Sequence, residues 1–139
     1  MKVTEIFVSS FDNKGQLPLY QSKVQAGFPS PAEDDMDSTL DLNEHLIRNP
    51  ASTFYVRVTG DSMVDAGIKE NDLLVVDKSM QPSHNKIVIA NVEGEFTVKR
   101  LKIINNEWFL VAENKNYPSM KINNNISIWG IVTAVIHQF

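Results

Sequence analysis

The sequence has 139 residues, a length typical of one domain, and its 42% hydrophobic and 22% charged residues argue against wholesale disorder. A net charge of −4 offers no strong field for phosphate groups, so we expect no direct binding of nucleic acid. The absence of cysteine excludes disulfides, cysteine-based zinc sites and thiol catalysis.

Residues 1–40 contain three prolines and an acidic run at 33–37, and they show no helical apolar periodicity over three turns. Because a residue before proline favours extended conformations, we expect an extended N-terminal arm over residues 1–40 without a core of its own. The first 20 residues lack the continuous apolar segment of a secretory signal, and no stretch approaches the roughly 20 apolar residues that span a bilayer. We therefore expect a soluble, cytoplasmic protein that makes no membrane contact.

The segment DLNEHLIRNP at 41–50 is the best helix candidate, because Asp41 can cap its start and Pro50 can end it. Turn residues such as Glu-Gly at 93–94 and Asn-Asn at 105–106 separate the strand candidates that follow. We predict a mainly β fold, with a compact domain of short, mostly antiparallel strands over residues 41–139. Six segments rich in β-branched and aromatic residues support this, at 53–58, 72–77, 86–92, 95–104, 107–113 and 126–139.

Ser62 lies in the stretch TGDSMVDAGIKENDLLVVD at 59–77, ahead of an apolar run. Gly60 permits a positive φ or a close backbone approach, and SMVDAG can form one helical turn that ends at Gly67. A serine at the start of such a turn would lie near unpaired backbone N–H groups, including that of Met63, which could stabilise an oxyanion. The same position also suits an ordinary N-capping serine, so the pattern leaves both roles open.

Lys99 lies in the predicted strand GEFTVKRL, where Thr97 and Lys99 share a face. A lysine on a half-buried sheet usually points to solvent. If apolar neighbours bury the amine instead, its pKa falls from about 10.4 towards roughly 7–8, and the neutral amine can activate a serine hydroxyl. Thr97 could then orient that amine through a hydrogen bond. The strand pattern leaves both interpretations of Lys99 open.

The sequence gives no evidence for a metal site or a nucleotide-binding site. The three histidines share no ligand spacing, so we expect no metal site. Neither a P-loop nor a G-x-G-x-x-G motif is present, and we expect no cofactor.

Four segments resemble, in their order along the chain, the UmuD branch of the LexA-like self-cleaving serine peptidases: QAGFPSPAED, DLNEHLIRNPAS, VTGDSMVDAGIKENDLLVVD and IVIANVEGEFTVKRL. The similarity runs from about Leu17 to the C-terminus. It implies a peptidase and dimerisation domain of the LexA/UmuD type, in which Ser62 is the nucleophile and Lys99 its general base. It also implies that the bond between Ala26 and Gly27, in the N-terminal arm, is cleaved.

The resemblance further implies a role in SOS mutagenesis. A RecA–nucleoprotein filament would stimulate self-cleavage, and the shortened homodimer would act as the accessory subunit of an error-prone, UmuC-like translesion DNA polymerase. One alternative is a truncated relative of the LexA-like repressors, against which the lack of a helix-turn-helix pattern argues. Another is a non-catalytic dimeric module that binds a polymerase, in which the serine and the lysine are inert.

Overall fold

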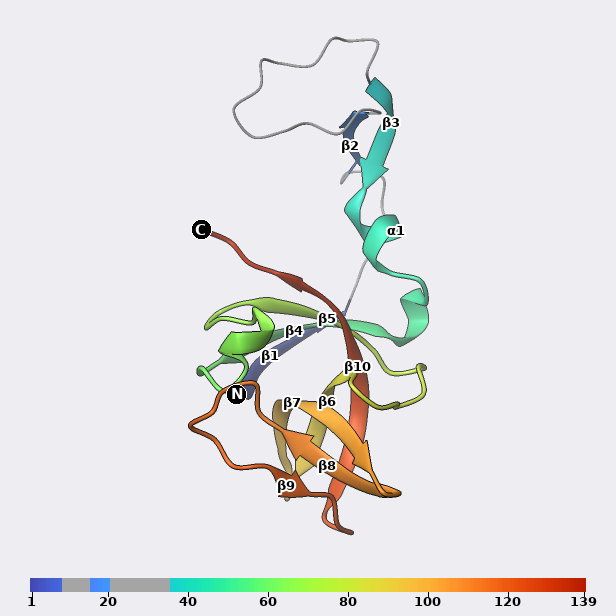
Figure 1. Ribbon diagram of the computed structural model, residues 1–139. Helices are drawn as coiled ribbons and strands as arrows, with labels where there is room; N and C mark the ends of the chain where they lie inside the picture. Colours follow the sequence, from blue (N-terminus) through green and yellow to red (C-terminus); the bar gives the residue numbers. More distant parts are fainter. Residues whose placement is uncertain (9–15, 21–35) are drawn as a thin grey trace. The chain divides into compact units, whose positions relative to one another are not determined.

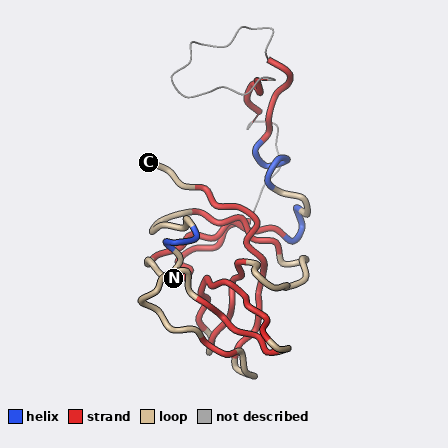
Figure 2. Tube along the Cα trace, viewed as in Figure 1, coloured by secondary structure: helices blue, strands red, loops and turns tan. Residues whose placement is uncertain are grey.

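The computed structural model describes residues 1–8, 16–20 and 36–139 (Figure 1). The chain divides into two compact units, one made of Met1–Ser9 and Asn49–Phe139, the other of Ser10–Arg48. Strands dominate the described residues and the helices are short, as Figure 2 shows. The prediction of a mainly β fold with antiparallel strands is therefore confirmed. In the described ranges, no helix is long and apolar enough to cross a membrane.

The larger unit is one eight-stranded sheet, whose strands pair in the order β1-β4-β5-β10-β6-β7-β8-β9. Six of these strands confirm the six β-rich segments of the sequence, and β1 and β9 are additional. The strands are β1 (Lys2–Val8), β4 (Thr53–Thr59), β5 (Leu73–Asp77), β6 (Ile87–Val92), β7 (Glu95–Ile104), β8 (Glu107–Val111), β9 (Met120–Lys121) and β10 (Ile126–Ile136).

Strand β1 closes part of this sheet into a ring, because it pairs with both β4 and β7. Lys2 lies opposite Thr59 of β4 and opposite Thr97 of β7. Closure provides partners for backbone groups of β4 and of the first part of β7 that would otherwise be unpaired. The expected arm over residues 1–40 is corrected at its start, since residues 2–8 belong to the sheet. Backbone pairing joins segments far apart in the sequence, which a local pattern does not reveal.

Strand β10 is the longest described strand and joins the two sides of the sheet. Its residues 126–131 pair with β6, and its residues 131–136 pair with β5. Figure 1 shows it as the orange-red strand between β5 and β6. The register shifts between Ile128 and Gly130, where a Cβ on Gly130 would lie only 2.5 Å from Cγ1 of Val76. Glycine therefore lets β10 approach β5 closely at this point.

Two clusters of buried apolar side chains fill the larger unit. Neighbouring residues of β6 fall into different clusters, as expected when successive side chains point to opposite faces of a strand. The sheet is therefore packed on both faces around β6 and β7. The first cluster contains Met1, Val56, Val58, Met63, Ile68, Leu74, Val76, Ile89 and Val98. The second contains Val88, Ala90, Leu101, Leu110, Ile126 and Ile131.

Two tight turns hold β6, β7 and β8 in sequence. Glu93 and Gly94 have φ values of 52° and 86°, and Asn105 and Asn106 have φ values of 52° and 64°. Positive φ at both central residues gives a turn whose twist matches that of the flanking strands. Both turns are where the sequence predicts them. They fix the register of β7, and with it the position of Lys99 opposite Val88.

The smaller unit contains a two-stranded antiparallel sheet of β2 (Gln16–Tyr20) and β3 (Met36–Asp41). Helix α1 (Leu42–Leu46) follows directly. Asp41 Oδ1 accepts a hydrogen bond of 2.9 Å from the Asn43 N–H, which confirms the predicted N-cap. The helix ends before Pro50, which opens a short 3₁₀ turn, so it is shorter than the predicted span of 41–50.

Candidate functional site

Ser62 lies on a sharp turn that leaves the end of β4. Gly60 has a φ of 101°, which favours glycine, and it turns the chain inward. A 3₁₀ turn at Val64–Ala66 follows, and Gly67 ends it in the left-handed conformation, as the sequence predicts. Ser62 itself is fully buried. A hydroxyl on an ordinary surface turn would be exposed, so this turn holds its serine inside the molecule.

Lys99 approaches Ser62 from the middle of β7. Its Nζ lies 3.1 Å from Ser62 Oγ, which is hydrogen-bonding distance. Burial lowers the pKa of the Lys99 amine, and a hydrogen bond with the α-amino group of Met1 opposes this shift. The structure thus brings together the two residues that the sequence singles out. A less protonated amine beside a hydroxyl is the arrangement that serine activation by lysine requires.

The α-amino group of Met1 is a third member of this cluster. It donates a hydrogen bond of 2.5 Å to Ser62 Oγ, and the Met1 residue is 7% exposed. Its pKa is lowered to about 5, by burial first and then by the charge and the hydrogen bond of Lys99. Asp61 opposes this shift, and Lys2 adds slightly to it. Two amines with lowered pKa therefore face one serine oxygen.

Thr97 and Met63, predicted as orienting and oxyanion residues, also lie at this cluster. Thr97 Oγ1 donates to the carbonyl oxygen of Met1 at 2.8 Å, a partner that differs from the expected Lys99 amine. Met63 is fully buried, and its Sδ accepts a hydrogen bond of 3.4 Å from the Glu113 N–H. Thr97 thus binds the backbone that covers the serine, while Met63 anchors the serine turn in the core.

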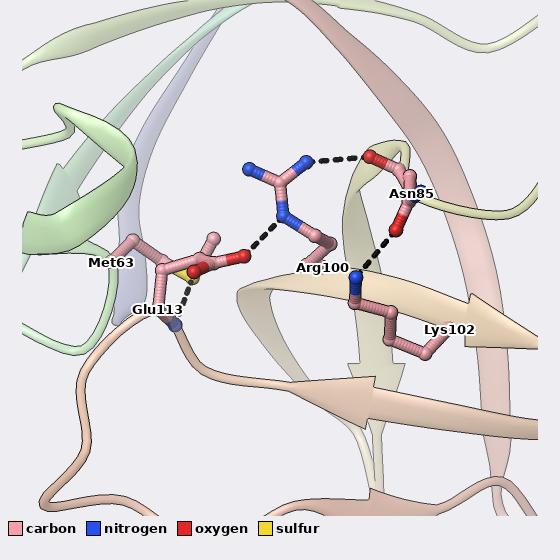
Figure 3. Close-up of polar contacts among 5 residues, drawn as sticks. All are labelled: Met63, Asn85, Arg100, Lys102 and Glu113. Carbon is pink, nitrogen blue, oxygen red and sulfur yellow. Dashed lines mark hydrogen bonds and ion pairs between the residues drawn. The ribbon is translucent and has the colours of Figure 1, made fainter.

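Glu113, which follows β8, connects the serine turn to β7 (Figure 3). Its backbone contacts Met63, and its carbonyl oxygen accepts a hydrogen bond of 2.9 Å from the Asp65 N–H. Its carboxylate pairs with Arg100, the residue after Lys99. Arg100 also donates to the carbonyl oxygen of Asn85, whose side chain accepts a hydrogen bond from Lys102, as Figure 3 shows. One residue therefore ties the strand of Lys99 to the turn of Ser62.

A second set of contacts holds Asp61, the residue before the serine. Tyr117 Oη donates to Asp61 Oδ1 at 2.5 Å, and Asn114 Nδ2 donates to the Asp61 carbonyl oxygen at 3.0 Å. The hydrogen bond with Asp61 raises the pKa of the Tyr117 phenol, with smaller contributions from desolvation and the Asp61 charge. The Tyr117 ring centroid lies 5.9 Å from Lys99 Nζ. The segment around 113–117 thus contacts the residue before Ser62 and lies near the Lys99 amine.

A surface pocket of about 300 Å³ opens beside the serine turn. Neither Ser62 nor Lys99 lines it, so the pocket does not expose the pair. Its lining residues are Gly60, Asp61, Val64, Ile68, Lys69 and Glu70. Within the described ranges there is also no group of three or more His, Cys, Asp and Glu side chains that could hold a metal ion.

Sequence reasoning missed Met1, Tyr117 and Glu113. Met1 and Tyr117 are 61 and 56 positions from the residues they contact at the serine turn, and no local signal connects them. Ala26 and Gly27, the predicted cleavage site, lie outside the described residues.

Comparisons with known proteins place the chain among characterised relatives. Residues 18–133 match the family model described as Peptidase S24-like. Protein ImpA of Salmonella typhimurium is 45% identical over 130 residues, which cover 93% of this chain and 89% of that protein. Protein MucA of Escherichia coli is 42% identical over 137 residues, with 96% and 92% covered. The LexA repressor of Shewanella piezotolerans is 40% identical over 125 residues, which cover 88% of this chain and 60% of the repressor.

Proposed function

Because the chain belongs to the Peptidase S24-like family, and within it is a UmuD-type SOS mutagenesis protein, we propose that it is a self-cleaving serine endopeptidase with a Ser62–Lys99 dyad. The observation that carries this proposal is the 3.1 Å between Lys99 Nζ and Ser62 Oγ. The lowered pKa of Lys99 supports it further, since a base must be neutral to accept a proton.

The proposed reaction passes through an acyl-enzyme. Neutral Lys99 accepts the hydroxyl proton of Ser62 while Oγ attacks the carbonyl carbon of the scissile peptide bond. The C–N bond then breaks, and the leaving amine takes the proton from Lys99. A water molecule gives a proton to Lys99 and attacks the ester carbon. The C–Oγ bond breaks, Lys99 returns the proton to Ser62 Oγ, and the new carboxyl group is released.

Two neighbours have supporting roles in this proposal. The N–H of Met63, directly after the nucleophile, would donate to the oxyanion of the tetrahedral intermediate. Thr97 would position peptide backbone beside the dyad, because its hydroxyl already binds a carbonyl oxygen there.

The proposed substrate is the bond between Ala26 and Gly27. The resemblance of QAGFPSPAED to the cleavage segments of the family carries this assignment. Small side chains on both sides of the bond suit a narrow site lined by strands. We propose that this bond lies within an N-terminal arm that extends to residue 40, apart from residues 2–8 in the sheet, and that residues 41–139 form the peptidase and dimerisation domain.

The cellular role follows from the UmuD type of the chain. We propose that a RecA–nucleoprotein filament stimulates cleavage in the cytoplasm. The product, residues 27–139, would form a homodimer and act as the accessory subunit of a UmuC-like error-prone polymerase in translesion synthesis. The net charge of −4 favours protein partners over direct contact with DNA.

Purified protein tests the peptidase directly. The chain is incubated at several pH values between 7 and 10, with and without an activated RecA filament, and the products are identified by mass spectrometry. We expect a fragment whose first residue is Gly27, formed faster at higher pH. Ser62→Ala and Lys99→Ala should each reduce the rate by at least about 10³-fold while the circular dichroism spectrum is unchanged.

Two results would contradict this proposal. Protein that stays intact after prolonged incubation at pH 10, and also with the filament, would favour the non-catalytic polymerase-binding module. Normal cleavage in either alanine variant would reject the assignment of the dyad.

A further inference from the structure

Ser62 is closed to solvent by the first residue of the chain. The serine is fully buried, and the Met1 amine lies 2.5 Å from its Oγ. A Cβ added at Gly60 would meet Met1 Cα at 3.5 Å, so the backbone of Met1 passes directly over the serine turn. No peptide can reach Oγ while Met1 occupies this place.

The backbone of β1 pairs with both β4 and β7, as a bound peptide strand would. The Met1 carbonyl oxygen accepts hydrogen bonds from the Val98 N–H at 3.0 Å and from Thr97 Oγ1 at 2.8 Å. Lys2 is paired with residues of both neighbouring strands, and the later residues of β1 continue along β4. Main-chain pairing of this kind is how a sheet edge holds an extended peptide.

The polarity of β1 matches one of the two products of peptide cleavage. When a peptide bond breaks at a serine, one fragment stays on Oγ as an ester, and the other leaves with a free amine at the point of attack. Strand β1 presents an amine at Oγ, and the chain runs away from it. The lowered pKa of the Met1 amine, to about 5, keeps it neutral at pH 7, as a newly released amine is.

We propose that the position of β1 between β4 and β7 is the binding site for the amine-side half of the cleaved peptide, and that β1 fills it as a product-like strand that must withdraw before a peptide bond reaches Ser62. This rests on the proposed peptidase function and adds its regulation. The ligand class is an extended peptide, recognised mainly through its backbone.

Strand β1 is attached weakly enough to withdraw and let a substrate peptide take its place. Apart from Met1 and the half-buried Val3, every side chain from Lys2 to Val8 is exposed. Val3 packs against the first core cluster, and directly after it the register on β4 shifts. An exposed ion pair between Lys2 and Glu95, at 3.0 Å, fastens the strand to β7.

A labelling experiment tests whether β1 is docked. Protein whose first residue is verified as Met1 receives a short pulse of an amine-reactive anhydride at low ionic strength, and the modified Met1 α-amine is quantified by peptide mapping. In the native protein we expect this amine to react at least about tenfold more slowly than in urea-unfolded protein, because closed states limit access. Equal rates in native and unfolded protein would overturn the proposal.

Charge reversal then tests whether docking controls cleavage. Lys2→Glu should loosen β1 by repulsion from Glu95, and both the labelling rate and the cleavage rate should rise about two- to fivefold. The double variant Lys2→Glu/Glu95→Lys should restore the native rates. Lys121→Glu is the matched control, because Lys121 and Glu107 form a similarly exposed pair on β9 and β8 at 3.1 Å, and it should change neither rate.

The outcomes separate this inference from the proposed function. If native protein cleaves itself and Lys2→Glu labels faster without cleaving faster, β1 does not control access and the inference is rejected. If no protein cleaves under any condition, the peptidase itself is rejected, and β1 is then only a structural strand.

Discussion

Lys99 Nζ and Ser62 Oγ lie 3.1 Å apart, although the two residues are 37 positions apart in the chain. Two structural features determine this distance. The register of β7 positions Lys99, and the 3₁₀ turn that ends in the left-handed conformation positions Ser62. The contacts of Glu113 with Arg100 and with the serine turn connect the two. This relationship supports predictions about both chemistry and stability.

The rate of self-cleavage should rise with pH and level off below the ordinary lysine pKa of about 10.4. Burial lowers the pKa of Lys99, so the neutral, active fraction grows as pH rises through a value lower than that of a free lysine. A pH–rate profile without filament measures this midpoint. Lys99→Arg should show no cleavage at any pH up to 10, because guanidinium stays protonated. A midpoint at or above 10.4 would contradict a buried base.

Tyr117→Phe should slow cleavage by about two- to tenfold, which corresponds to the loss of one ordinary hydrogen bond to Asp61. The ring near Lys99 remains in this variant, so the pH midpoint should not move. Tyr117→Leu removes the ring as well and should slow cleavage further. Single-turnover rates and thermal unfolding distinguish the effects, because the melting temperature should change little. A normal rate in the leucine variant would show that the contact is incidental.

Asp77→Ala should destabilise the protein by about 2 kcal/mol at pH 7. Burial alone would raise the pKa of Asp77, but hydrogen bonds from Asn49, Ser79 and Ser52 outweigh it and hold the value at about 2. The unfolded carboxyl group titrates near pH 3.9, so the stabilisation is complete above about pH 5 and is lost as pH falls towards 2.

Urea unfolding at pH 7 and pH 3 measures this change for Asp77. The difference in free energy of unfolding between the native protein and the Asp77→Ala variant should be smaller at pH 3 than at pH 7. Asp65→Ala is the control, because Asp65 is exposed and its substitution should change stability by less than about 0.5 kcal/mol. A difference that is constant with pH would mean that packing, and not the charge of Asp77, accounts for the effect.

Gly130→Ala should cost about 1–3 kcal/mol of stability, because its Cβ would lie 2.5 Å from Val76 Cγ1 in the closed core. Ser127→Ala on the same strand is exposed and should be nearly neutral. The double variant Gly130→Ala/Val76→Ala relieves the clash, so its cost should be smaller than the sum of the two single costs. Additive costs in urea unfolding would argue against the contact.

Local patterns predicted much of the fold. Alternating β-rich segments gave strands β4 to β8 and β10, and Gly67, Asp41 and the two hairpin turns behave as their residue types require. Strand β1 was not predicted, because its membership in the sheet depends on pairing with β4 and β7 and not on its own seven residues. The two residues of β9 are too few to give a periodic signal.

The candidate site was predictable only through resemblance to a family. The sequence alone left Ser62 as a possible cap and Lys99 as a possible surface lysine, since burial and distance are properties of the folded chain. The contacts of Met1 and Tyr117 connect segments more than 50 positions apart, beyond the range of any periodic pattern. The expected partner of Thr97 differed because β1 supplies a carbonyl oxygen 2.8 Å from its hydroxyl.

The two pairing partners of β10 also determine how the larger unit comes apart. Its side chains contribute to both hydrophobic clusters, with Ile126 and Ile131 in one and Val132 against the other. Detaching this strand would expose both clusters together, so neither can melt while the other persists. Heat should therefore disassemble the larger unit in a single cooperative step, and the central amide protons of β10 should be among the last to exchange with solvent.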